Sequence, residues 1–156
     1  MGRVALHRYF EDVEVGYELP SLAKEVTLEQ QAMYAAATWD IKGTLHYDSG
    51  SAQKLGLPAA LAEGPMVAAF LAQVVTDWMG ASGTFRKMNV SYRGMVFPGD
   101  RLVCKGKVAR IYRDTGQGFI QCQVSAENQR GDKVVYGTAL VTLPCRDEPD
   151  GRRTGS

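Results

Sequence analysis

The sequence has no excess of charge and no long uninterrupted apolar run. Eighteen lysines and arginines balance 17 aspartates and glutamates, a formal net charge of +1, so nothing electrostatic favours a nucleic acid or an anionic membrane as partner. The longest apolar stretch, residues 65–80, is broken by Gln73 and Asp77 and falls short of the roughly 20 residues that cross a bilayer. The N-terminus has no apolar core of signal-peptide length. We therefore expect a cytoplasmic protein.

Cysteine and histidine are also scarce. Cys104, Cys122 and Cys145 are widely spaced and match no short-range metal-ligand pair. We expect them to be small buried residues, and we predict no metal or redox cofactor. The histidines are His7 and His46, and histidine is the side chain whose charge changes near neutral pH. Few residues are therefore candidates for acid–base chemistry.

The remaining composition suits one compact domain. The 156 residues are 45% apolar and 22% charged, which is close to the globular average and enough to bury a core. The sequence contains no internal repeat. We predict a single domain over residues 1–145, followed by a disordered tail over residues 146–156, which are charged and rich in glycine and proline.

The front half predicts helices and a polar loop. Thr27 and Gln30 have the spacing of a capping box, so a helix is expected to follow Thr27. Residues 38–50 form a polar loop with apolar anchors, and residues 51–55 suit a short helix. Gly64-Pro65 begins a second helix over about residues 65–79, apolar on nearly every side. That pattern is typical of a buried central helix.

The back half changes to the alternating pattern of strands. A turn-rich segment over residues 10–20 and a possible short strand over residues 23–26 precede it in the chain. Each separator between the later strands contains glycine with aspartate or proline, as hairpin turns require. We predict an α+β fold in which an antiparallel meander packs against the central helix. Its strands are expected over residues 85–96, 101–112, 118–128 and 133–143.

Two features of the sequence suggest chemistry. His46 lies between Asp40 and Asp48 in the polar loop, where it suits a general acid or base, although a lone histidine among loop aspartates also suits a structural role. Trp39 and Ile41 flank Asp40 and are expected to desolvate it. Gly64, at the head of the central helix, has a backbone N–H that suits an oxyanion hole, although many helices simply begin this way.

The order of these parts resembles the MaoC-like, (R)-specific enoyl-thioester hydratase and dehydratase family, which has the hotdog fold. The resemblance covers about residues 9–144. It implies a single hotdog domain, an antiparallel sheet wrapped around the helix at about residues 65–79. It also implies a hydro-lyase that hydrates trans-2-enoyl thioesters or dehydrates (R)-3-hydroxyacyl thioesters, linked to CoA or to a carrier protein. The segments that carry it are YFEDVEVGYELP, AAATWDIKGTLHYDSGSAQKLGLPAALAEGPM, VSYRGMVFPGDRLVCKGKV and NQRGDKVVYGTALVTLP.

The resemblance also implies roles for particular residues. Asp40 and His46 match the pair that holds the reacting water, and Gly64 matches the glycine that binds the thioester carbonyl oxygen. Beside them, the substrate-binding residues are predicted to be Tyr47, Glu63 and Pro65. No cofactor is expected beyond the CoA or phosphopantetheine of the substrate. The family implies a homodimer or a dimer of dimers, or a heteromer with another hotdog chain.

The sequence departs from the family at three points, which leave alternatives open. The family's Asp-x-Asn-Pro-(apolar)-His loop is one residue longer here, so counting back without a gap places Ile41 at the aspartate position. Gly43-Thr44 replaces Asn-Pro. Glu63 stands where many relatives have histidine, and we expect it to be solvated at the edge of the site, with an acid–base role as the alternative. These changes also suit a degraded subunit that supports an active partner.

A hotdog thioesterase is the last of the alternatives. Such an enzyme usually carries its carboxylate on the central helix. Asp77 is the only carboxylate inside that helix and lies near its C-terminal end, so this function ranks below the other two.

Overall fold

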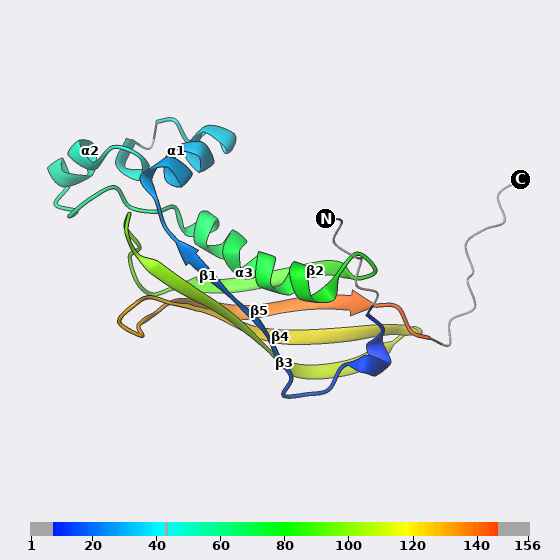
Figure 1. Ribbon diagram of the computed structural model, residues 1–156. Helices are drawn as coiled ribbons and strands as arrows, with labels where there is room; N and C mark the ends of the chain where they lie inside the picture. The colour runs from blue at the N-terminus through cyan, green and yellow to red at the C-terminus, as the bar shows by residue number, and fades with distance from the viewer. Residues whose placement is uncertain (1–7, 43, 147–156) are drawn as a thin grey trace, which may run out of the picture.

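The computed structural model describes residues 8–42 and 44–146. Five antiparallel strands form one sheet in the order β1-β3-β4-β5-β2, and a long helix lies along one face of it (Figure 1). The predicted α+β architecture is therefore confirmed. His7 and the predicted tail beyond Arg146 lie outside the described residues. The elements of this core are β1 (Glu18–Glu25), α3 (Gly64–Met79), β2 (Thr84–Tyr92), β3 (Arg101–Asp114), β4 (Gln117–Glu127) and β5 (Lys133–Leu143).

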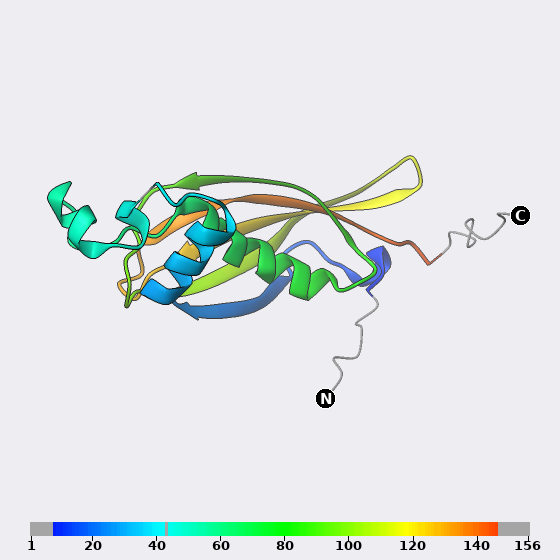
Figure 2. The ribbon, with the colours of Figure 1, turned by 90° about the horizontal axis from the view of Figure 1, so that it is seen from above.

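Short helices precede α3 and gather near its N-terminal end (Figures 1 and 2). The predicted capping box begins α1 (Leu28–Ala37): the Gln30 N–H donates to the Thr27 hydroxyl at 3.2 Å, and the Thr27 N–H donates to the Gln30 side chain at 3.3 Å. The predicted polar loop follows, and it contains a 3₁₀ turn, η2 (Thr44–His46). The expected short helix is α2 (Ser49–Lys54), which Asp48 caps.

Helix α3 begins and ends as its sequence predicts, but one side of it is uncovered in the single chain. Pro65 stands in the first turn, and Gly80 ends the helix at φ 70°. Most of its large side chains face the sheet and are buried, including Leu71 and Val75. Ala69 and Thr76, on the other side, are exposed. The expectation of burial on nearly every side is therefore wrong for the isolated chain.

The sheet is not the simple meander that the turns predict. Strands β3, β4 and β5 follow one another as hairpins, but β2 pairs with β5 at the far edge. It ends at Tyr92 because the next two N–H groups, of Arg93 and Gly94, donate to the Val134 carbonyl. The chain then crosses to the end of β1, where the Gly99 N–H donates a hydrogen bond to the Val26 carbonyl. These long-range bonds make residues 93–100 a crossover.

Strand β1 is longer than predicted and includes a proline. It covers eight residues rather than residues 23–26, with an irregularity between Leu19 and Leu22 in its pairing with β3. Pro20 lies at that irregularity. A proline is tolerated there because β1 is an edge strand, whose outer N–H groups have no strand to bond. The local sequence therefore predicts only part of β1, and the rest of the strand forms because it pairs with β3.

The core lies between α3 and the sheet and includes Cys104 and Cys122; Cys145 is buried as well, so all three cysteines are buried as predicted. Burial raises the pKa of the Cys104 thiol to about 11 and that of Cys122 to about 12. Both thiols are therefore protonated and unreactive near neutral pH. Across the described ranges, no helix has both the length and the apolar character that a bilayer crossing requires.

Candidate active site

The predicted site residues come from two segments that meet at the N-terminal end of α3. The N–H of Leu61 donates to the Leu45 carbonyl at 2.9 Å, and the N–H of Ala62 donates to the Val96 carbonyl at 2.8 Å. These bonds hold the segment that enters α3 between η2 and the crossover loop. His46 and Gly64 are thereby brought to the same end of the helix, although 18 positions separate them in the sequence.

His46 is oriented by the backbone. Its Nδ1 lies 2.7 Å from the Leu61 carbonyl oxygen, which only accepts hydrogen bonds, so Nδ1 carries the proton. In the neutral ring, Nε2 is then the free acceptor. That nitrogen lies 4.0 Å from Asp40 Oδ2. The distance is too long for a direct hydrogen bond and leaves room for one water oxygen to contact both atoms.

Asp40 is positioned by the end of α1. Its N–H donates to the Ala35 carbonyl and the N–H of Trp39 donates to that of Ala36, the two bonds of a Schellman motif. Trp39 takes the left-handed position at φ 61°, where glycine is usual. Trp39 is 82% exposed and Ile41 54%, so the expected desolvation of Asp40 is wrong: its side chain remains 44% exposed.

Glu63 differs most from its expectation. It is only 9% exposed, and its Oε1 is buried without a hydrogen-bond partner. Burial raises the pKa of the Glu63 carboxyl above its ordinary value of 4.5; the charge of His46 opposes the rise and that of Asp40 adds to it. The expectation of a solvated residue at the edge is therefore wrong. The buried carboxylate of this site is Glu63 rather than Asp40.

Gly64 is packed against an aromatic ring. A Cβ at this position would lie 2.9 Å from Tyr92 Cε1, so glycine allows the ring to approach the backbone. Gly64 is also the first residue of α3, where N–H groups have no intrahelical acceptor. Pro65 follows in the same turn and is exposed. The backbone N–H of Gly64 is therefore among the donors that α3 itself leaves without an acceptor.

Three tyrosines also lie at this site, and only one of them was predicted from the sequence. The Tyr47 hydroxyl, predicted to bind substrate, donates to the Ile41 carbonyl at 2.5 Å and closes the loop. Tyr34 and Tyr92 were not predicted; burial and the charge of Glu63 raise the pKa of Tyr34. Their approach depends on the packing of α1 and β2, for which the local sequence has no signal.

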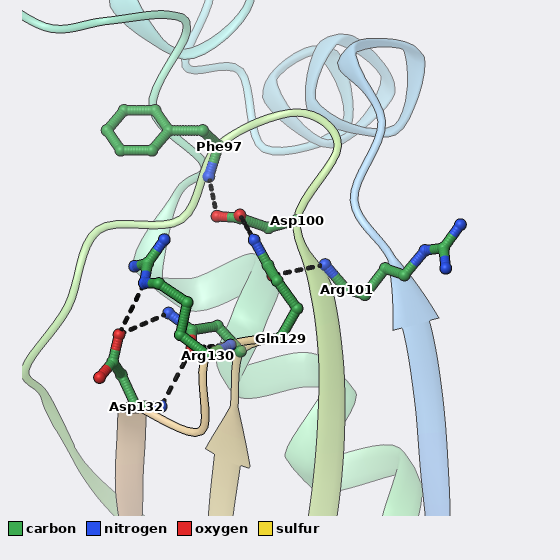
Figure 3. Close-up of polar contacts among 7 residues, drawn as sticks. Phe97, Asp100, Arg101, Gln129, Arg130 and Asp132 are labelled. Atoms are coloured by element: carbon green, nitrogen blue, oxygen red, sulfur yellow. Dashed lines mark hydrogen bonds and ion pairs between the residues drawn. The ribbon is translucent and has the colours of Figure 1, made fainter.

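Hydrogen bonds around Asp100 and Gln129 link the crossover loop to the β4–β5 turn (Figure 3). Asp100 accepts hydrogen bonds from the Phe97 N–H at 2.9 Å and from Gln129 Nε2 at 2.8 Å. Gln129 Oε1 accepts in turn from the Arg101 N–H. Val96, in the same crossover loop, accepts a hydrogen bond from the Ala62 N–H of the segment that enters α3, so these bonds connect the β4–β5 turn to the site.

The described residues contain no grouping of three or more histidine, cysteine, aspartate or glutamate side chains able to hold a metal. A groove of about 750 Å3 lies on the sheet face opposite α3, among Lys105, Gln123 and Tyr136. None of the predicted site residues lines this groove. The predicted acid–base residues lie instead at the head of α3.

Comparison with known proteins identifies the family to which this chain belongs. The profile of the family described as "MaoC like domain", a dehydratase family, matches residues 14–129. The chain belongs to this family, and its fold is the hotdog fold.

Three relatives illustrate the likeness. The chain is 29% identical over 137 residues to the fatty acid synthase subunit beta of Gibberella zeae; the match covers 86% of this chain and 6% of that much longer protein. The (R)-hydratase of A. caviae involved in PHA biosynthesis superposes with a TM-score of 0.76 at 24% identity, over 86% of this chain and 99% of that one. The HadBC (3R-hydroxyacyl-ACP dehydratase) complex of Mycobacterium tuberculosis gives 0.71 at 16% identity, over 82% and 96%.

Proposed function

We propose that the protein adds water to trans-2-enoyl thioesters, or removes it from (R)-3-hydroxyacyl thioesters, carried on CoA or a carrier protein. The observation that carries this proposal is the pairing of His46 Nε2 with Asp40 Oδ2 at 4.0 Å. The Leu61 carbonyl keeps the proton on Nδ1, so Nε2 is ready to accept one. Membership of a dehydratase family supports the same reaction class.

The reaction follows from these positions. A water between the two side chains gives a proton to His46 Nε2 while its oxygen bonds to C3 of the substrate. The C2–C3 double bond becomes single, C2 gains a proton, and negative charge develops on the thioester oxygen in between. The Gly64 N–H, at the positive end of α3, stabilises that oxygen. Asp40 holds the water and the imidazolium in place.

The substrate supplies its own CoA or phosphopantetheine, so the reaction needs no further cofactor. Tyr47 holds the loop, and Pro65 borders the path to Gly64. The enzyme works as a homodimer or dimer of dimers, or together with a second hotdog chain, in the cytoplasm. Complex formation by a dehydratase of the same fold supports the heteromeric form.

Absorbance of the enoyl-thioester band tests the proposal. Crotonyl-CoA and a longer trans-2-enoyl-CoA are mixed with wild type, His46→Ala and Asp40→Asn. Wild type should remove the band, and each variant should be slower by about 10²- to 10⁴-fold, the usual contribution of a positioned acid or base. Asp114→Asn, at the far end of β3, is the matched control and should retain full activity.

An inactive wild type favours the second candidate, a subunit that needs an active partner. The one-residue-longer loop between Asp40 and His46 is the feature that favours it. A second hotdog chain recovered by pull-down, whose addition restores activity that survives His46→Ala, would establish that role. Activity that depends on His46 in the protein alone would exclude it.

A further inference from the structure

The buried carboxyl of Glu63 has no function in the fold that its contacts explain. It stands at the N-cap position of α3, yet its side chain makes no capping hydrogen bond. Its Oε1 is buried and unpartnered, although a buried polar atom normally has a partner because leaving it unpaired is costly. A group kept in this state next to Gly64 points to a ligand that completes its bonding.

We propose that Glu63 is a third acid–base residue of the site, which delivers a proton to C2 of the enoyl thioester during hydration and removes it during dehydration. This role rests on the proposed function. Gly64, the next residue, is the donor assigned to the thioester oxygen, and C2 is one bond from the carbonyl carbon. Its place directly before that donor is what assigns this proton to the Glu63 carboxyl.

The division of labour balances the reaction. In hydration, His46 Nε2 takes a proton from water as the oxygen bonds to C3, and protonated Glu63 gives its proton to C2. The enzyme is left with an imidazolium and a carboxylate. Transfer of the proton from His46 to Glu63 through water restores the starting state. No oxidant, reductant or metal takes part in the cycle.

The surroundings of Glu63 favour this use. Burial raises the pKa of its carboxyl, so that the proton donor is populated at higher pH than for an exposed glutamate. The groups that face it are His46 from η2, Asp40 after α1 and Tyr34 of α1. Tyr92 of β2 borders the adjacent Gly64. A pH profile must therefore be compared among variants at Glu63 itself.

The test compares Glu63→Gln, which keeps the shape and removes the proton, with Glu63→Asp and wild type. Hydration by Glu63→Gln should fall by about 10²- to 10⁴-fold. The decline of kcat/KM at high pH in wild type, caused by loss of the Glu63 proton, should vanish in Glu63→Gln and persist in Glu63→Asp. Glu18→Gln, exposed on β1, is the matched control and should change neither the rate nor the profile.

Thermal unfolding separates this role from a structural one. Because the pKa of Glu63 is raised in the fold, its stabilising contribution is complete below about pH 4.5 and is lost as pH rises through the folded pKa. Glu63→Gln should therefore fold, and its Tm relative to that of wild type should increase as pH rises. Active wild type together with a fully active Glu63→Gln contradicts this role alone. Wild type inactive on both substrates contradicts the proposed function and this role with it.

Discussion

A strained backbone conformation is confined to few of the described residues, and one of them lies at this site. Among the described residues, only Trp39 and Thr115 have positive φ without being glycine. The left-handed conformation costs a bulky residue roughly 1–2 kcal/mol. Such strain concentrates where function requires it. Trp39 precedes the candidate carboxylate and Thr115 stands in the β3–β4 turn, so the chain itself contains a test and a control.

Replacement of Trp39 by glycine should therefore stabilise the protein and reduce its activity. Relief of strain, less the entropy that glycine adds to the unfolded chain, predicts a gain of about 0.5–1 kcal/mol in the free energy of unfolding. Thr115→Gly should give a similar gain at full activity. Urea unfolding and the hydration assay measure both quantities. A Trp39→Gly variant as active as wild type would show that the strain at this position does not serve the reaction.

The residues of the site were predictable to different extents. Asp40 and His46 share one loop, so their proximity follows from the local sequence. Glu63 and Gly64 were also found, as a helix start, but the burial of Glu63 was not. It depends on segments from η2 and the crossover loop, which come together only in the folded chain. Tyr92 had no signal for the same reason.

At the scale of elements, local rules predicted the helices and two of the three strand pairings that a four-strand meander implies; the third failed because β2 pairs with a strand distant in the sequence. The capping box at Thr27 and the β3–β4 and β4–β5 hairpins involve neighbours in the sequence, and all are confirmed. The pairing of β2 with β5 joins strands with two others between them. A compact turn over residues 97–100 predicts a hairpin, but the bonds of residues 93–94 to Val134 and of Gly99 to Val26 divert the chain.

Gly137 makes the β2–β5 pairing possible. A Cβ there would lie 1.9 Å from the Asn89 carbonyl oxygen and 2.8 Å from Val90 Cα, so backbone of β2 would have to move. Gly137→Ala should therefore cost about 3 kcal/mol, at the upper end of overpacking penalties. Activity should fall as well, because β2 carries Tyr92 to Gly64. Chemical denaturation and the hydration assay measure the two effects.

Gly106→Ala is the matched control for that substitution. Gly106 faces the same side of the sheet, but its added Cβ would meet side-chain atoms, the nearest of them Leu19 Cδ2 at 2.9 Å, rather than the backbone of a neighbouring strand. Its cost should be clearly smaller. Equal losses for the two variants would contradict a specific need for glycine beneath β2.

At the scale of the molecule, one side of the hotdog protomer has an unpaired strand edge and incompletely covered apolar residues. Strand β2 is an edge strand, and residues 87–92 pair regularly with β5 and contain no proline. By contrast, the β1 edge is interrupted at Pro20. Phe85, Met88 and Val90 of β2 are only half-buried, and Ala69 of α3 is exposed. A long unprotected edge beside uncovered apolar surface favours pairing with a second chain.

We expect the purified protein to have at least twice the mass of the 17.0 kDa chain in light scattering after size exclusion. Ala69→Glu tests which face pairs. Glutamate is a good helix former and Ala69 is exposed, so a monomer would tolerate the change. A charge buried between two chains would be costly, and this variant should dissociate at unchanged secondary structure. Ala109→Glu makes the same substitution at an exposed residue of β3, at the irregularity of its pairing with β4, and should leave the assembly intact. An oligomer that resists Ala69→Glu and dissociates with Ala109→Glu would place the interface at β3 instead of α3. The site at the head of α3 would then work within one protomer.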